Sequence, residues 1–345
     1  MNRSITRRRW ATTALATAAV LVAGGATAQA TGTFLGSTPS TAEETVVLST
    51  GMAETTSATG SSTLGPATVV YAPGTAPVPS TTTAPRPGGL PGATNTGVPA
   101  GITLKVHTGD LVITQDNTVI DGLDVRGFIE VRAKNVVIRN TKVRGTYTER
   151  YRALIRVENG FSATIEDSEL AAANPSPWVD GIRGFNFTAR RVNIHNVIDS
   201  VHIYGSNVTL ENSWLHDNLH YANDPAWNGG PSHDDSIQIT QGSNLRFLNN
   251  NISGSTSAGF MVTQGQGIVS NLEISGNRAD GGACTVNFSE KGRGPIQGVK
   301  ILTNTFGRNT THADCAIIAP ETTRAIITAT GNTYTDGTAA TIRRG

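Results

Sequence analysis

Three short stretches of the chain place an aspartate three residues before a different polar side chain. The stretches read DGIRG from Asp180, DSVHI from Asp199 and DSIQI from Asp235. The polar side chains in the fourth position are Arg183, His202 and Gln238. This set contains a cation, an amide donor and a group that exchanges protons near neutral pH, and it is typical of sites that bind anions or transfer protons.

Alternation within these stretches predicts which side chains point outward. Successive residues of a strand point to opposite faces, so the polar residues lie outside if their aliphatic neighbours face a core. The resulting outward column is Arg156, Arg183, His202, Gln238, Met261 and Thr285. Single arginines on an exposed sheet are often only solvated. Four consecutive hydrogen-bonding side chains in one column favour a functional site.

The three aspartates would repel one another if the strands stack directly. Three kinds of compensation are open: backbone N–H groups of a turn, a bound cation such as calcium, or a proton shared between carboxyl groups. Asp180, Asp199 and Asp235 are therefore candidate calcium ligands as well as turn residues. Calcium is the one cofactor that this pattern suggests.

The elements that would position these residues are short repeated strands. The pattern aliphatic-x-aliphatic-x-(Asn, Asp or small) recurs in VVIRN, VNIHN, VTLEN and LRFLN, and a second alternating segment precedes most copies. With the further copies TIED, LEISG, VKILT and ITATG, successive copies lie 16 to 37 residues apart, as expected when loops of different length leave one side of a solenoid. The asparagines expected to stack as a turn ladder are Asn140, Asn196, Asn212 and Asn249.

The repeat over residues 110–335, with VTLENSWLHDN as a typical copy, resembles the parallel β-helix of the pectin-lyase-like superfamily. The resemblance implies an all-β fold, a single-stranded right-handed parallel β-helix (solenoid) of about 8–10 coils. It does not define an activity, because lyases, glycosidases, epimerases, esterases and adhesins share this architecture. Cys284 and Cys315 occupy the same slot of consecutive repeats and are expected to form a disulfide, the alternative being two buried thiols.

Two long loops lead into the stretches that begin at Asp180 and Asp235. They carry the aromatic residues Trp178, Tyr221 and Trp227, whose flat rings suit stacking on sugars or covering the scaffold. The second loop, residues 217–234, also brings His233 and Asp234 to the same edge. Lys291, in SEKGRGPIQG, is expected to form the opposite wall.

The N-terminus has the pattern of an export signal. Residues 1–30 contain a basic segment, a short apolar run and small-x-small cleavage sites, and residues 31–97 are rich in Thr, Ser, Pro and Gly. We therefore expect a signal peptide over 1–30, a disordered linker over 31–97, and a β-helix domain over 98–345. Removal of 1–30 takes four arginines and no acid, which leaves 23 basic and 26 acidic residues. The protein is expected to be secreted and monomeric, with no nucleic-acid partner and no membrane span.

These features favour an exported protein that cleaves a uronic-acid-containing glycan by β-elimination. Such a reaction needs a cation or donor at the carboxylate, a base for the C5 proton and an acid for the leaving oxygen. The residues expected to take part in catalysis are His202, His233, Asp234, Asp235 and Arg183. The residues expected to bind substrate are Arg156, Gln238, Asp199, Tyr221, Trp227, Trp178 and Lys291.

Alternative functions stay open. A glycoside hydrolase would use Asp199, Asp234 and Asp235, which resemble the acidic cluster of polygalacturonases, although their Gly-His-Gly and Arg-Ile-Lys elements are missing. A recognisable arginine pattern of pectate lyases is missing too. An epimerase would share the first half-reaction of a lyase, and a non-catalytic β-helix would only bind glycans. A zinc site of His216, His220 and His233 is disfavoured, because HDNLH has no helix to align its two imidazoles.

Overall fold

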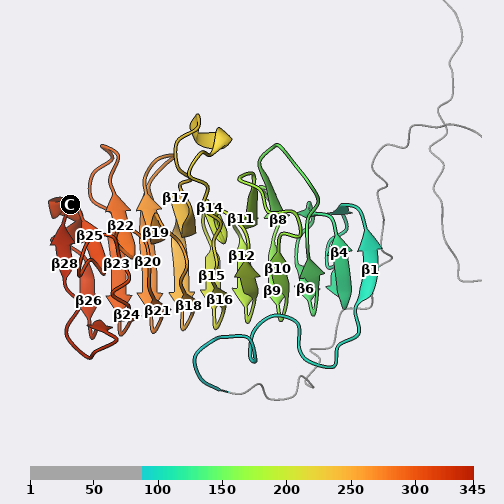
Figure 1. The fold of residues 1–345 in the computed structure, drawn as a ribbon, viewed down its shortest axis with the longest axis horizontal. Helices are drawn as coiled ribbons and strands as arrows, with labels where there is room; N and C mark the ends of the chain where they lie inside the picture. The colour runs from blue at the N-terminus through green and yellow to red at the C-terminus, as the bar shows by residue number, and fades with distance from the viewer. Residues whose placement is uncertain (1–87) are drawn as a thin grey trace, which may run out of the picture. The chain divides into compact units, whose positions relative to one another are not determined.

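The computed structural model describes residues 88–345. The predicted signal peptide and the predicted linker up to residue 87 lie outside the described residues. Within residues 88–345 the chain winds as a right-handed parallel β-helix whose strands all pair in parallel with the coils before and after them (Figure 1). The prediction of an all-β, single-stranded parallel β-helix is confirmed.

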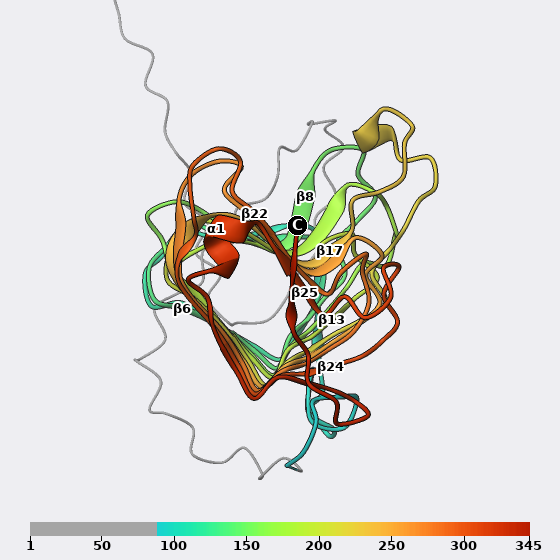
Figure 2. The ribbon, with the colours of Figure 1, turned by 90° about the vertical axis from the view of Figure 1, so that its left-hand side faces the viewer.

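Three sheets form the sides of the coils, as the end-on view shows (Figure 2). Sheet A consists of β1 (Lys105–Thr108), β4 (Leu123–Arg126), β7 (Lys142–Val143), β10 (Glu169–Ala171), β13 (Asn193–His195), β16 (Trp214–Leu215), β18 (Asn251–Ile252), β21 (Arg278–Ala279), β24 (Thr305–Phe306) and β27 (Thr333–Tyr334). Its ten strands, one for each coil, agree with the expected number of coils.

The other two sheets are joined through β17 (Asp235–Leu248), whose first half lies in sheet B and whose second half lies in sheet C. Sheet B also holds β2 (Leu111–Ile113), β5 (Ile129–Val131), β8 (Arg152–Val157), β11 (Val179–Gly184), β14 (Val201–Tyr204), β19 (Ala258–Thr263), β22 (Val286–Ser289), β25 (Ile317–Ala319) and β28 (Ile342–Arg344). Sheet C also holds β3 (Val119–Asp121), β6 (Val136–Arg139), β9 (Ala163–Glu166), β12 (Phe187–Arg190), β15 (Val208–Glu211), β20 (Val269–Ser275), β23 (Gln297–Leu302) and β26 (Thr328–Thr330). Two short helical segments, η1 (Pro225–Trp227) and α1 (Glu321–Arg324), lie in loops.

The sequence predicted two strands in each repeat, whereas the structure has three. The strands of sheets B and C correspond to the two alternating segments. The missed strands belong to sheet A, and several, such as β16, contain only two residues. A two-residue strand has no room for a period-2 pattern, so alternation could not reveal it.

Alternation in sheets B and C fills the interior with aliphatic and aromatic side chains. In β14, for example, Val201 and Ile203 are fully buried, and Ile182 and Ile237, the two register partners of Val201, are buried as well. Like residues therefore lie over like residues along the axis. Burial of this continuous apolar column is the main favourable contribution to folding, because no single coil can cover its own inner face.

The corner between sheets C and A holds a buried asparagine ladder. The amide Nδ2 of Asn250 donates to Asn277 Oδ1 at 3.0 Å, Asn277 Nδ2 donates to Asn304 Oδ1 at 3.0 Å, and Asn304 continues to Asn332 at 2.9 Å. The predicted ladder was wrong. Asn140, Asn212 and Asn249 occupy the preceding corner position with positive φ, and Asn196 lies at another corner. The ladder residue is the next one along, because its side chain points inward.

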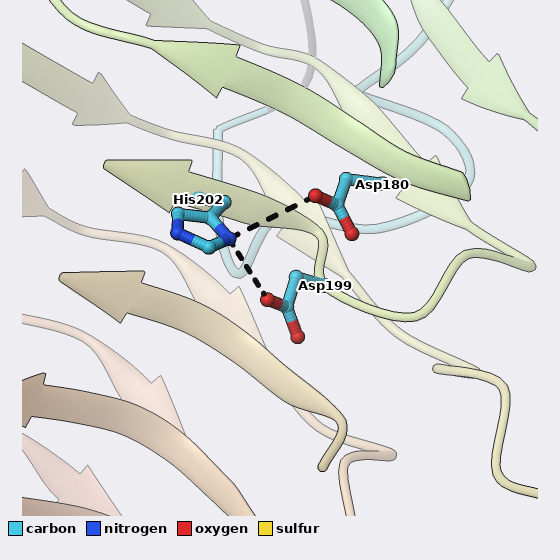
Figure 3. A group of neighbouring side chains, drawn as sticks. All are labelled: Asp180, Asp199 and His202. Atoms are coloured by element: carbon cyan, nitrogen blue, oxygen red, sulfur yellow. Dashed lines mark ion pairs between the residues drawn. The ribbon is translucent and has the colours of Figure 1, made fainter. Parts of the chain in front are cut away.

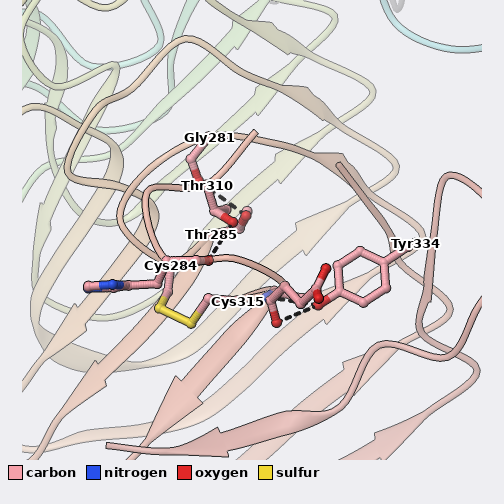
Figure 4. Close-up of a disulfide and its surroundings, with 9 residues drawn as sticks. Gly281, Cys284, Thr285, Thr310, Cys315 and Tyr334 are labelled. Carbon is pink, nitrogen blue, oxygen red and sulfur yellow. Dashed lines mark hydrogen bonds between the residues drawn. A yellow bond between two sulfur atoms is a disulfide. The ribbon is translucent and has the colours of Figure 1, made fainter. Parts of the chain in front are cut away.

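The disulfide prediction is confirmed: Cys284 and Cys315 are bonded, with their Cα atoms 4.8 Å apart (Figure 4). The bond joins neighbouring coils at the edge where β22 and β25 begin, since Val286 and Ile317 are register partners. Both cysteines are buried.

Replacement of both cysteines by serine is expected to lower the free energy of unfolding by about 2–4 kcal/mol, because the bond closes a loop of about 31 residues in the unfolded chain. Urea unfolding of the oxidised protein and of the Cys284→Ser/Cys315→Ser variant measures the difference. A difference below about 1 kcal/mol would show that the stacked coils alone constrain this end of the solenoid.

The segment that precedes the first coil lies against sheet A. The backbone N–H of Gly97 donates to Arg191 O at 2.9 Å, and Asn251 Nδ2 donates to Pro91 O at 2.9 Å. Composition placed residues 91–97 in the linker, yet Pro91, Thr96 and Gly97 are buried. Within the described part of the chain, no helix is long and apolar enough to span a membrane.

Candidate active site

The outward column on sheet B has the register expected from alternation. Arg156 pairs with Arg183, Arg183 with His202, His202 with Gln238, and Gln238 with Met261 in β8, β11, β14, β17 and β19. Four polar side chains therefore follow one another on adjacent strands, about 4.8 Å apart.

The column continues with Asn287, not with Thr285. Phe260 pairs with Val286 and Met261 with Asn287, so the inward residues of β22 lie two positions later than predicted. Thr285 is fully buried, and its hydroxyl donates to Gly281 O at 3.1 Å (Figure 4). The error arose because Cys284 and Thr285, which lie in the turn before β22, alternate apolar and polar in the same way as the strand itself.

Asp180, Asp199 and Asp235 form a second, buried file beside this column. Each lies two residues before an inward aliphatic residue of its strand, and the backbone N–H of Asp235 donates to Asp199 Oδ1 at 2.9 Å. Register partners of the outer two acids are Ala153 and Ala258, so the file is three coils long. The three residues are 1–4% exposed.

Each acid contacts the outward side chain three residues later in its own strand. Arg183 Nη1 lies 3.1 Å from Asp180 Oδ2, and Gln238 Nε2 donates to Asp235 Oδ2 at 3.1 Å. His202 Nδ1 lies 3.4 Å from Asp199 Oδ2 and 3.8 Å from Asp180 Oδ2 (Figure 3). The buried acids therefore orient the outward column.

Burial shifts the pKa values of the three acids upward. Desolvation raises the pKa of Asp180 to about 6, with a further increase from Asp199 and an opposing effect of His202 and Arg183. Burial raises the pKa of Asp199 to about 7, and the pKa of Asp235 lies well above its usual value for the same reason and because Asp199 is near. Shared or retained protons thus join hydrogen bonds in compensating the stacked carboxyl groups.

His202 is shifted in the opposite direction. Burial lowers its pKa to about 4, although Asp180 opposes the shift. Its Nδ1 faces the acids, whereas Nε2 is buried and has no hydrogen-bond partner within residues 88–345. A buried acceptor without a partner is costly in a folded protein and commonly marks a reactive or ligand-binding position.

The charged column on sheet C is built differently. Asp121, Arg139, Glu166, Arg190 and Glu211 follow one another on adjacent strands, so that each charge lies beside the opposite sign. Arg139 and Asp121 are 2.8 Å apart, and Arg190 and Glu166 are 2.5 Å apart. Neutralised ladders of this kind stabilise a surface. On sheet B, by contrast, Arg156 lies beside Arg183 and three buried carboxyl groups stack beside the outward column, which distinguishes this sheet as the candidate site.

The stability of the fold is expected to fall as pH rises from 6 to 8. Asp199 and Asp235 lose their protons near pH 4 in the unfolded chain but keep them to higher pH in the fold. The free energy of unfolding therefore falls as pH rises, until the pH exceeds the raised pKa values of the two acids. The lowered pKa of His202 acts in the opposite sense, but its effect ends at about pH 6.5, the pKa of an unfolded histidine.

Thermal unfolding at pH 6 and pH 8 tests this expectation. At about 2–4 °C for each kcal/mol, the midpoint should fall by about 5 °C or more in the wild-type protein. Asp199→Asn keeps an oxygen that can accept the Asp235 N–H and should show a smaller fall. Equal falls in both proteins would mean that Asp199 is ionised in the fold.

The loops that connect sheet A to sheet B lie beside the outward column and the file of buried acids. Trp178 packs edge-to-face on Tyr151, with ring centroids 5.0 Å apart, and Tyr151 lies 5.9 Å from the Arg183 guanidinium carbon. On the longer loop, between β16 and β17, Trp227 stacks on His233 at 3.7 Å, and Tyr221 is half-buried beside Asp224. The predicted aromatic residues therefore lie at one edge of sheet B.

Comparisons with protein-family models, curated proteins and solved structures gave no match. The geometry of sheet B therefore carries the functional argument.

Asp234 lies outside the file of three acids, although it precedes Asp235 directly. It is fully buried and accepts hydrogen bonds from the Thr256 N–H and hydroxyl, both at 2.6 Å, while His220 Nδ1 lies 2.8 Å away. Asp234 thus joins the long loop to the next coil.

Lys291 lies at the edge of sheet B opposite the two long loops, but in a later coil. It follows β22, three strands beyond β14, in the turn between sheets B and C, and its side chain is exposed. This turn belongs to a coil that the outward column reaches only after Met261, so Lys291 is not next to His202. Its part in substrate binding stays a prediction.

One group of side chains within residues 88–345 could hold a metal ion. Single ligand atoms of Asp180, Asp199 and His202 lie within 4.8 Å of one another, whereas Asp235, the third predicted ligand, is not part of the group. The three histidines of the disfavoured zinc site are held separately: His216 stacks on Trp214 of sheet A, His220 pairs with Asp234, and His233 stacks on Trp227.

Tyr151 is a site residue that the sequence did not reveal. Its ring lies 5.9 Å from the Arg183 guanidinium carbon, and burial together with the charges of Asp180, Asp224 and Asp199 raises its pKa. The only signal was the loop before β8, which is long for its coil. Its partner Trp178 was predicted, and register pairing of the two strand starts identifies the contact.

Proposed function

We propose that the chain is an exported polysaccharide lyase that cleaves a uronic-acid-containing glycan by β-elimination. The setting of His202 carries the proposal. Its Nδ1 faces two carboxyl groups, its lowered pKa keeps it neutral at pH 7, and its Nε2 has no hydrogen-bond partner within the described residues. A neutral, oriented imidazole is suited to remove a proton from carbon.

Arg183 and Gln238 flank His202 in the column and supply hydrogen-bond donors. As the C5 proton leaves, negative charge develops on the uronate carboxylate, and fixed donors beside the base stabilise it. The Arg183 side chain is 26% exposed while it contacts Asp180, and Arg156 lies on the next strand. Arginine is suited to bidentate binding of a carboxylate.

Burial of the acids favours elimination over hydrolysis. The side chains of Asp180 and Asp199 are 4% and 6% exposed, below the layer formed by Arg183 and His202. In this position they orient the outward side chains, whereas hydrolysis needs carboxyl groups that touch the glycosidic bond. His202 Nε2 is itself covered, so a bound glycan must displace the side chains above it.

A glycoside hydrolase is the second candidate. The raised pKa of Asp199 supports it, because a carboxyl group that is protonated near pH 7 can act as a general acid. Movement of the covering side chains would have to expose this acid.

The pattern of residues 1–30 supports export, and the Cys284–Cys315 disulfide is typical of an oxidising compartment. We also propose that the protein acts as a monomer.

Incubation of the protein with alginate, polygalacturonate and glucuronan tests the proposal. A lyase gives ultraviolet absorbance from unsaturated ends together with new reducing ends. Reducing ends without absorbance would identify a hydrolase, and altered NMR spectra without cleavage would identify an epimerase. Binding without any chemical change would leave a glycan-binding module.

A further inference from the structure

A second histidine–aspartate pair lies at the edge of the candidate site. His220 Nδ1 is 2.8 Å from Asp234 Oδ1, and the carboxylate is fully buried. The Thr256 hydroxyl donates to the same oxygen at 2.6 Å, and the Thr256 N–H donates to Oδ2 at 2.6 Å. Contacts with His220 and Thr256, which lie in different coils, therefore fix the orientation of the Asp234 carboxylate.

This pairing determines how His220 is presented. Nδ1 points inward to Asp234 and to the Thr256 hydroxyl, which lies 2.8 Å away. The opposite ring nitrogen, Nε2, therefore points away from the buried carboxylate, and the side chain is 37% exposed. A carboxylate at Nδ1 holds the ring in one orientation, as in other histidine–aspartate pairs.

Hydrogen bonds place His220 beside the acid file. Two residues earlier, the Asn218 side-chain amide donates to Ile198 O at 2.7 Å and reaches Asp235 O at 3.4 Å. The Leu219 N–H donates to Val197 O at 2.8 Å. These hydrogen bonds place the backbone just before His220 next to the turn that contains Asp199. The charge of Asp234 also contributes to the raised pKa of Asp199.

We propose that His220 is a second catalytic residue, the general acid that protonates the leaving glycosidic oxygen. The inference rests on the proposed lyase function and assigns the one role that the sheet-B column does not fill. Asp234 is then a positioning residue. His233, on the same loop, stacks on the exposed Trp227 ring and so lies in a different environment from His220.

The step balances with two proton transfers. His202 Nε2 takes the C5 proton, and the electron pair of that C–H bond is first held as an enolate of the uronate carboxylate. The same pair then forms the C4–C5 double bond. The C4–O bond breaks, and His220 Nε2–H gives its proton to the departing oxygen. His202 ends protonated and His220 neutral, and exchange with water restores both.

Exchange in D2O separates the two roles on whichever of alginate, polygalacturonate or glucuronan the wild-type protein cleaves. His220→Gln is expected to lower cleavage by about 10²–10⁴-fold while deuterium still enters C5, because His202 is intact. His202→Gln should lose both exchange and cleavage. His195→Gln, which alters a histidine 3.3 Å from Glu169 on sheet A, is the matched control and should keep both.

Each other outcome is decisive. Wild-type cleavage rates in His220→Gln, or loss of C5 exchange together with cleavage, would overturn the role of His220. Cleavage that survives His202→Gln but not His220→Gln would leave His220 in place and remove His202 as the base. If the wild-type protein cleaves none of the three glycans, the proposed function fails and the inference fails with it. Asp234→Asn should shift the pH profile of cleavage, which a purely structural contact would not do.

Discussion

His202→Ala is expected to reduce turnover on a cleaved glycan by about 10²–10⁴-fold, the usual contribution of a general base. The reason is local: the variant removes the one neutral imidazole whose inner nitrogen faces Asp199 and Asp180. Folding should persist, because loss of the side chain also removes a buried nitrogen that lacks a partner within the described residues. Initial rates at saturating substrate and a thermal unfolding curve measure the two effects.

Met261→Ala is the matched control for this experiment. Met261 occupies the same column, paired with Gln238, and has no proposed role in proton transfer. Its turnover should stay within about a factor of two of wild type, far from the loss expected for the base. Full activity of His202→Ala on a confirmed substrate would remove sheet B as the active site.

Asn277→Ala is expected to lower the free energy of unfolding by about 3–6 kcal/mol, since at least three buried groups lose a partner at about 1–3 kcal/mol each. The groups are the Asn250 N–H, the Asn250 amide and Phe247 O, which are bonded to the Asn277 side chain at 2.8–3.0 Å. Urea unfolding measures the loss.

Asn223→Ala, in the exposed part of the long loop, provides the comparison. It should change the free energy of unfolding by less than about 0.5 kcal/mol, as surface substitutions usually do. A loss of under 1 kcal/mol in Asn277→Ala would mean that the ladder is not a main source of cohesion between coils.

Period-2 alternation was sufficient to predict the fold and half of the candidate site. It aligned Arg156, Arg183, His202 and Gln238 on four adjacent strands, because an inward aliphatic residue on each side of a polar residue leaves only one register. The same rule placed the three aspartates in one file. It failed at Thr285, where a turn imitates the alternation of a strand.

Contacts made by loops could not be predicted in this way. His220 and Asp234 are separated by 14 residues, and Asp234 and Thr256 by 22, so their meeting depends on the path of an excursion with no periodic pattern. Tyr151 was missed for the same reason. The burial of the site residues could not be predicted from the sequence either. The opposite pKa shifts of His202 and Asp199 arise from desolvation, and the extent of desolvation depends on the packed structure.

The path of residues 91–97 has a consequence for how the domain is held. Pro91 is bonded to Asn251 of β18, well along the solenoid, so the chain joins the domain at the flank formed by sheet A and not at the first coil. Residues 91–97 therefore tie the N-terminal end of the described chain to coils in the middle of the solenoid. Sheet B is a different side of the same coils, so this segment and the proposed site lie on different sides of the domain (Figure 2).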